Sequence, residues 1–148
     1  MEVFLKWDRI LSEYDERWQY NRGLYAYLAP NRKQTILYIG KIDGCTVRAR
    51  HRANDKQKVW RKIEHSLGFY KHSVIVATLY LENGRRFTSG LLTDIESLLI
   101  HYVQPFGNTS NTKTRYIARP GLKVICKGDW YFSQKTFVDI GPTIAVRF

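Results

Sequence analysis

Apolar positions recur along the chain with two different periods, and each period predicts a type of element. Between Phe4 and Trp18 they follow the i, i+3, i+4, i+7 spacing of one helix face, which comprises Phe4, Trp7, Ile10, Leu11, Tyr14 and Trp18. Residues 24–28 and 35–39 are short aromatic and β-branched runs on either side of a turn at 30–33. The pattern therefore predicts an N-terminal helix followed by an antiparallel hairpin.

The middle of the chain predicts two helices, a strand and a third helix. Thr46 is a suitable N-cap for a basic helix. A second helix over about 56–67 is supported by its apolar spacing and ends at Gly68. Residues 73–81 form the strongest strand pattern, ahead of an Asn-Gly turn. From Thr88 or Ser89 to Val103 the apolar residues again share one helix face.

The last part of the chain has β character at 122–126 and at 130–132. The elements thus run helix, two strands, two helices, strand, helix and a β-rich extension. This order predicts an α+β fold in which a small three-stranded antiparallel sheet is flanked by helices. A chain of 148 residues can build one domain around its own core, and no repeat or linker divides it.

The charge of the chain is concentrated in its middle third. The net charge is +11, and residues 46–90 carry ten basic and three acidic side chains. Within residues 46–62 only Asp55 opposes the basic residues, which are Arg48, Arg50, Arg52, Lys56, Lys58, Arg61 and Lys62. Such a run is typical of a polyphosphate partner, but a solvated helix face has the same composition. Charge alone gives the two interpretations about equal weight.

Several classes of protein are disfavoured. Cys45 and Cys126 are too few for a disulfide framework, and no CxxC or Cys/His cluster indicates a zinc site. The first residues lack the long apolar run of a signal peptide, and no run approaches the roughly 18 residues of a membrane span. We therefore expect an intracellular, cytoplasmic protein without a membrane partner.

Two tripeptides carry a family resemblance. Gly23-Leu24-Tyr25 and Tyr38-Ile39-Gly40, with twelve residues between the two tyrosines, resemble the signature pair of the GIY-YIG nuclease superfamily. The family pattern continues with an arginine in the next helix, a helical glutamate further along and an asparagine beyond it, which are here Arg50, Glu96 and Asn108. The resemblance covers residues 23–108 and implies a GIY-YIG-like core within a single domain, 1–148. The N-terminal helix of residues 1–22 and a C-terminal extension, 109–148, lie outside it.

The resemblance implies a metal-dependent endonuclease that hydrolyses DNA phosphodiester bonds, of a restriction, phage, mobile-element or repair type. In that chemistry Tyr25 deprotonates or orients the attacking water with help from Tyr38, and Arg50 stabilises charge on the scissile phosphate. Glu96, at the border of its helix's apolar side, would hold a single Mg²⁺ or Mn²⁺. Asn108 would either anchor the glutamate helix or touch the substrate.

A set of cations is expected to contact nucleic acid: Lys41, Arg48, Arg52, Lys56, Lys58, Arg61 and Lys62. The family resemblance makes DNA the expected partner. RNA stays open, because phosphate contacts do not distinguish DNA from RNA. A domain with one active site that cuts both strands would work as a homodimer.

One departure from the family pattern leaves alternatives open. Many members carry His or Tyr one helical turn after the arginine, whereas Arg50 is followed there by Asn54, which cannot act as a base. Either His51 serves, or Arg48 is the equivalent arginine with Arg52 one turn on, or the role is absent. The departure keeps a second function open, a GIY-YIG-like module that binds nucleic acid without turnover. A third, a basic interaction protein without a nucleic-acid role, would make the motif matches coincidental.

Overall fold

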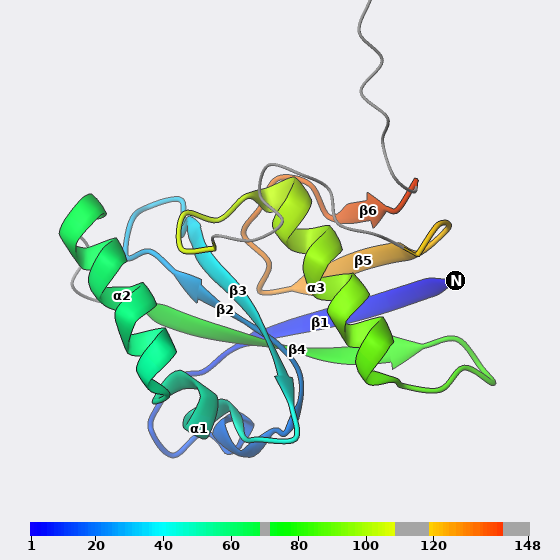
Figure 1. Ribbon diagram of the computed structural model, residues 1–148, viewed down its shortest axis with the longest axis horizontal. Coiled ribbons are helices and arrows are strands. Elements are labelled where there is room, and N and C mark those ends of the chain that lie inside the picture. Colours follow the sequence, from blue (N-terminus) through cyan, green and yellow to red (C-terminus); the bar gives the residue numbers. More distant parts are fainter. Residues whose placement is uncertain (69–71, 109–118, 141–148) are drawn as a thin grey trace, which may run out of the picture.

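The computed structural model describes residues 1–68, 72–108 and 119–140 (Figure 1). In these ranges the chain has an α+β fold with six strands, three α-helices and one short 3-10 helix. The strands are β1 (Glu2–Arg9), β2 (Arg22–Leu28), β3 (Ile36–Asp43), β4 (Ser73–Leu81), β5 (Lys123–Gly128) and β6 (Thr136–Val138). The helices are η1 (Glu16–Gln19), α1 (Val47–His51), α2 (Asn54–Leu67) and α3 (Ser89–Val103). Parts of the expected extension, 109–118 and 141–148, lie outside the described residues.

All six strands belong to one mixed sheet, in the order β3-β2-β4-β1-β5-β6. The β1–β5 pair is parallel, and the other neighbours are antiparallel. The three strands predicted for the core, β3, β2 and β4, lie side by side at one end of this sheet. The predicted number of strands is wrong, because β1, β5 and β6 extend the sheet beyond β4.

The central predictions are confirmed: the hairpin, the strand at 73–81 and the three helices of residues 46–103 are all present. Thr46 and Thr88 cap α1 and α3, since their hydroxyls accept hydrogen bonds from Ala49 N at 3.1 Å and Leu91 N at 3.0 Å. Gly68 ends α2 in the left-handed conformation, with φ of 73°. None of the helices in the described ranges has the length and apolar surface that a membrane crossing would require.

The helix predicted over Phe4–Trp18 is wrong, because residues 2–9 form strand β1. Val3, Leu5 and Trp7 are fully buried while Lys6 is exposed, which is the period of two of a strand. Leu11 and Tyr14, members of the predicted helical face, are 81% and 87% exposed. β1 pairs with β4 on one side and β5 on the other, and this long-range pairing overrides the helical spacing.

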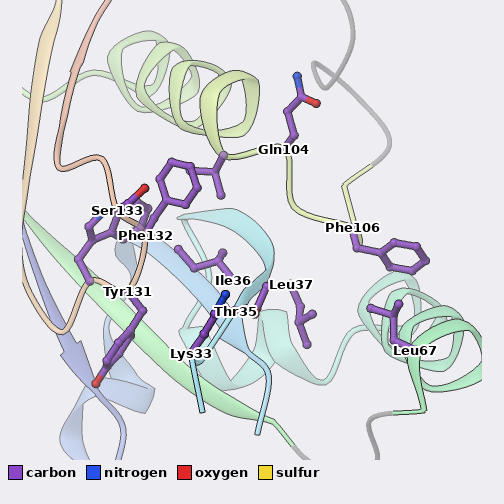
Figure 2. Close-up of a pocket in the computed structure, with 12 residues that line it drawn as sticks. Lys33, Thr35, Ile36, Leu37, Leu67, Gln104, Phe106, Tyr131, Phe132 and Ser133 are labelled. Atoms are coloured by element: carbon purple, nitrogen blue, oxygen red, sulfur yellow. The ribbon is translucent and has the colours of Figure 1, made fainter. Parts of the chain in front are cut away.

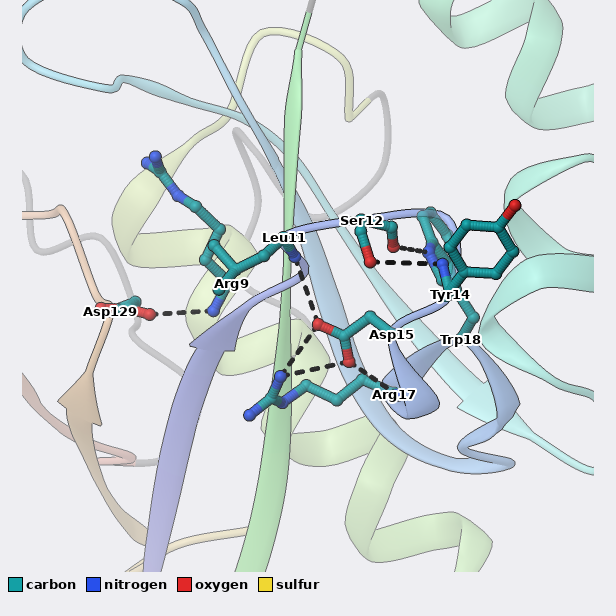
Figure 3. Close-up of polar contacts among 8 residues, drawn as sticks. All are labelled: Arg9, Leu11, Ser12, Tyr14, Asp15, Arg17, Trp18 and Asp129. Carbon is teal, nitrogen blue, oxygen red and sulfur yellow. Dashed lines mark hydrogen bonds and ion pairs between the residues drawn. The ribbon is translucent and has the colours of Figure 1, made fainter.

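Side-chain contacts hold the chain after β1 in a loop and the short η1 (Figure 3). The Asp15 carboxylate accepts hydrogen bonds from Leu11 N at 3.2 Å and Arg17 N at 3.0 Å, and it pairs with the Arg17 guanidinium at 3.0 Å. At the end of β1, Arg9 N donates to the Asp129 carboxylate at 2.8 Å. These bonds satisfy backbone donors that a continuous helix would otherwise satisfy.

The strand predicted at 130–132 is also wrong. Trp130 N donates to Gly128 O at 2.8 Å in a tight turn, and the Trp130 ring stacks on Trp7 with centroids 5.1 Å apart. The strand that follows is β6, which pairs with β5. The aromatic run therefore reflects packing against β1.

The two faces of the sheet carry separate buried clusters. Leu24, Ala26 and Leu28 of β2 pack with α3 on one face, and the alternate residues Tyr25 and Tyr27 pack with α1 and α2 on the other. β3 is the edge strand, so side chains from both faces can meet along it. This edge is where the candidate site lies.

The alternation in β1 predicts how substitutions there affect stability. Leu5→Ala should lower the free energy of unfolding by about 2–5 kcal/mol, because it empties a fully buried position. Lys6→Ala, on the exposed side, should change it by less than about 0.5 kcal/mol. Chemical denaturation measures both values, and similar losses for the two variants would contradict the strand register.

Candidate active site

The cross-strand register joins the two tripeptides into one structural unit. Tyr25 pairs with Gly40 and Tyr27 pairs with Tyr38 across β2 and β3. A Cβ built on Gly40 would lie 2.5 Å from Cζ of Tyr25, so the phenol ring occupies the space that any other side chain at position 40 would need. Tyr25 of the first tripeptide therefore packs directly against Gly40 of the second.

Three phenol rings gather on this face of the sheet. The ring centroids of Tyr25, Tyr27 and Tyr38 are 5.5–5.9 Å apart. Burial raises the pKa of Tyr25 far above its usual value, and the neighbouring phenols raise it further. Tyr25 is therefore protonated at neutral pH, which favours the orienting role over the role of base, and both roles stay predictions.

The two signature tyrosines differ in access. Tyr25 is fully buried, and its hydroxyl interacts with the phenols of Tyr27 and Tyr38. Tyr38 is 8% exposed and lines a cavity of about 310 Å³. Tyr38 is thus the phenol that a molecule in this cavity can reach, and Tyr25 lies behind it.

Lys56 is a member of the site that the charge pattern assigned to the nucleic-acid surface. Lys56 is only 6% exposed and lines the cavity, so it does not belong to the exposed basic surface, and its contact with nucleic acid stays a prediction. Its ammonium donates a hydrogen bond to the Tyr38 hydroxyl and lies 3.4 Å from the Asp55 carboxylate. Its spacing was a usable signal, since Lys56, Val59 and Ile63 follow the i, i+3, i+7 pattern of the buried face of α2.

The structure separates the competing arginines. Arg50 forms an ion pair with Asp55 at 3.2 Å. Burial works to lower the pKa of Arg50, but the adjacent Tyr25 and Asp55 raise it, so the guanidinium stays charged beside the phenols. Arg48 instead donates to the Glu13 carbonyl and lies 5.3 Å from the Trp18 ring centre. Arg50 is therefore brought to the tyrosines and Arg48 is not.

Glu96 projects from α3 toward the same edge. Burial raises the pKa of its carboxyl, and the positive charges of Lys41, Lys56 and Arg50 oppose that shift. Each cation also has another polar contact: Lys41 donates to Thr93 Oγ1 at 2.7 Å, Arg50 pairs with Asp55, and Lys56 donates to Tyr38 and pairs with Asp55. The Glu96 carboxylate accepts a hydrogen bond from the Lys41 backbone, and among the described residues no cationic side chain forms an ion pair with it. One backbone bond leaves further lone pairs on the carboxylate that can bind a metal ion.

The donor set at this edge suits one type of metal. No group of three His, Cys, Asp or Glu side chains in the described ranges could enclose an ion. Mg²⁺ is commonly held by one or two carboxylates together with water and substrate phosphate, and it prefers oxygen donors. A half-buried carboxylate that has no direct ion-pair partner in the part of the chain that the structure describes fits that description, and Mn²⁺ accepts the same oxygen ligands.

Asn108 acts on the backbone of β3. Its carboxamide accepts a hydrogen bond from Ile39 N at 2.9 Å and donates one to Ile39 O at 2.8 Å. Gly107 N donates to Leu37 O at 2.7 Å. These bonds occupy the free edge of β3 beside Tyr38, so of the two expected roles the structure favours an anchor, with β3 as the anchored element.

The remaining expected cations surround the cavity or the surface near it. Lys58 and Lys62 are exposed and line the 310 Å³ cavity together with Tyr38, Lys56 and Asn108. Arg52 and Arg61 are exposed. The basic surface therefore borders the cavity along α2.

His51 lies behind the phenols. Its Nδ1 is 2.9 Å from the Tyr27 hydroxyl, and its ring packs near His72 with centroids 5.3 Å apart. Burial lowers the pKa of His51, and it lowers that of His72 to about 4. The alternative in which His51 acts beside Arg50 therefore places its nearest hydroxyl at Tyr27, away from the cavity.

Comparisons of the chain with family models, with curated proteins and with solved structures find no match. The assignment of function therefore rests on the residues and their geometry.

The buried His72 predicts a dependence of stability on acid. The unfolded chain takes up a proton on this residue below about pH 6.5 but the folded chain only near pH 4, so stability is full above that range and falls as the pH drops through it. His72→Phe should remove this part of the loss, about 3 kcal/mol between pH 7 and 4. Urea unfolding at several pH values measures the difference, and parallel curves for the two proteins would contradict it.

Proposed function

We propose that this protein is a GIY-YIG-type, metal-dependent endonuclease that hydrolyses DNA phosphodiester bonds. The observation that carries the proposal is the convergence of Tyr25, Tyr38, Arg50 and Glu96, from four different elements, on one edge of the sheet. Phenols, a guanidinium and a carboxylate beside a cationic cavity are suited to phosphate-ester hydrolysis. In the reaction a water oxygen bonds to phosphorus and one P–O ester bond breaks, leaving a phosphate monoester and a hydroxyl.

Arg50 is the group that stabilises charge on the scissile phosphate. The Arg50 side chain is 37% exposed. A phosphate oxygen can therefore bind its guanidinium beside, or in place of, the exposed carboxylate of Asp55. Guanidinium groups bind phosphate oxygens through two parallel hydrogen bonds. Tyr25 lies beneath Arg50 and acts as a positioning residue for it.

Tyr38 is the group that orients the attacking water. The Lys56 ammonium has only donors, so the Tyr38 oxygen must be the acceptor of their hydrogen bond. The hydroxyl proton of Tyr38 is then directed to another acceptor, which in the cavity is a water or a phosphate oxygen. In this proposal Tyr38 takes the leading role that the family resemblance gave to Tyr25.

Glu96 would hold the metal ion. When bound, Mg²⁺ or Mn²⁺ supplies Lewis-acid stabilisation of charge on the phosphate oxygens. Burial raises the pKa of the Glu96 carboxyl, and the cations around it oppose that shift and so favour the ionised form that a metal ligand requires.

The exposed cations of α2 favour a nucleic acid as the partner, and the family resemblance makes DNA the expected one. Lys58 and Lys62 are exposed and line the cavity, and Arg61 is exposed on the same helix, so these side chains can bind phosphates flanking the cut. Such contacts bind the backbone without reading sequence. A second candidate function is a module that binds nucleic acid without turnover, and the Glu96→Gln experiment distinguishes it from a nuclease.

Glu96→Gln should lower the rate of Mg²⁺-dependent cleavage by at least about 100-fold, because a carboxamide of the same shape is a poor metal ligand. DNA affinity and melting temperature should change little. Cleavage of a labelled oligonucleotide measures the rate, and Glu64→Gln, the same change on α2, is the matched control. Full activity of Glu96→Gln would refute the metal role, and wild-type binding without cleavage in any metal would select the binding module.

Arg50→Ala should lower the cleavage rate at saturating DNA by about 100-fold, the loss expected for a group that stabilises the transition state. Arg48→Ala should mainly weaken binding and leave this rate nearly unchanged, because the Arg48 guanidinium lies at the Trp18 ring and not at the phenols. Single-turnover kinetics over a range of protein concentrations separate rate from affinity. An inert Arg48→Ala together with an active Arg50→Ala would move the site to the other side of α1.

A further inference from the structure

A second pocket, lined largely by aromatic and aliphatic side chains, opens beside the start of β3 (Figure 2). It has a volume of about 850 Å³ and is called here the aromatic pocket. Tyr131 and Phe132 lie on one side of it, Phe106 and Leu67 on the other, with Ile36 between them (Figure 2).

The lining of the aromatic pocket combines ring faces with hydrogen-bonding groups. Phe106 is 42% exposed, so part of its ring is accessible to a ligand in the pocket. Thr35, Gln104 and Ser133 add polar atoms at its wall, and Lys33 adds a positive charge. No acidic residue is among the described residues that line it. Aromatic faces, amide and hydroxyl groups and nearby ammonium groups are the features that bind an unstacked nucleobase and its phosphates.

The aromatic pocket adjoins the candidate active site through two chain segments. Leu37 and Phe106 line the pocket, and the next residue in each case, Tyr38 and Gly107, lines the active-site cavity. The ammonium of Lys62, which lines that cavity, is 5.6 Å from the ring centre of Phe106. A nucleic-acid strand with a phosphate at Tyr38 therefore passes directly from the cationic cavity to the aromatic pocket.

The spacing along β3 fits a short step along a strand of nucleic acid. Thr35 and Tyr38 are three residues apart, which corresponds to about 10 Å of extended chain. Stacked bases are spaced by about 3.4 Å per strand, so the pocket lies within a few nucleotides of the scissile phosphate.

We propose that the aromatic pocket binds an unpaired nucleobase of the substrate strand close to the cut. A base inside a duplex is paired and stacked and cannot enter such a pocket without leaving the helix. The preferred substrate is therefore DNA with unpaired nucleotides beside the scissile bond. This inference rests on the proposed nuclease function, because it uses the phosphate site at Tyr38 as its reference point.

The test compares two single strands with identical phosphates. One is a fluorescein-labelled strand of fifteen thymidines, and the other has abasic residues at its central positions. Fluorescence anisotropy is measured in chelator, so that binding is read without cleavage. The wild-type protein should bind the thymidine strand about 10-fold more tightly, the scale expected for base stacking on an aromatic ring.

Two variants test whether the pocket causes this preference. Phe106→Leu, which keeps an apolar side chain but removes the ring, and Phe106→Ala should both lose most of the preference. The melting temperature of Phe106→Leu should stay close to that of the wild type, because Phe106 is already 42% exposed and leucine keeps an apolar side chain there. Neither variant should change affinity for a duplex of the same length. Tyr14→Ala is the matched control, since it removes an aromatic ring that is 87% exposed and does not line the pocket.

The outcomes for the pocket and for the nuclease are separate. Equal wild-type affinity for the two strands, or a preference that both Phe106 variants retain, would overturn the pocket assignment even if the protein cleaves DNA. A preference that the Phe106 variants lose supports the pocket. If the protein then fails to cleave in Mg²⁺ or Mn²⁺, the proposed function is overturned and base binding stands.

Discussion

The close approach of the Tyr25 ring to Gly40 is the contact on which the candidate site depends. It requires glycine at position 40, and it sits within the β2–β3 register that sets Tyr27 opposite Tyr38. A slip of one residue would turn every side chain of β3 to the other face of the sheet. The phenols would then no longer gather beside α1 and α2, and Lys56 would lose the hydroxyl that accepts its hydrogen bond. The two tripeptides therefore determine the β2–β3 register, and the arrangement of the site depends on that register.

Burial gives this cluster its chemical character. The phenol of Tyr25 stays neutral, while the cations Arg50 and Lys56 are held against Asp55 and Tyr38. A buried ammonium is costly unless it is hydrogen-bonded and paired, and Lys56 has both partners. Because these partners come from β3 and α2 itself, the charge is fixed in position before any substrate arrives. Preorganised charge of this kind is what stabilises a phosphoryl transition state.

The sequence predicted the elements whose stability is local and missed those that depend on distant pairing. Strand 73–81 and the capped helices were recoverable from alternation, Thr46, Thr88 and Gly68. The N-terminal segment satisfied a helical spacing, yet it is a strand because β4 and β5 pair with it from far along the chain. Within the site, spacing alone could not choose between Arg48 and Arg50, since the choice depends on how α1 packs. The burial of Lys56 was readable from the apolar face of α2, although its charge suggested a surface position.

We propose that this preorganised cluster hydrolyses DNA. The most direct measurement is incubation of the purified protein with supercoiled plasmid in Mg²⁺, in Mn²⁺ and in chelator, followed on an agarose gel. If the protein is a metal-dependent endonuclease, we expect nicked or linear plasmid with either metal and intact supercoiled plasmid in chelator. Plasmid that stays supercoiled in both metals at protein concentrations that saturate binding would contradict it.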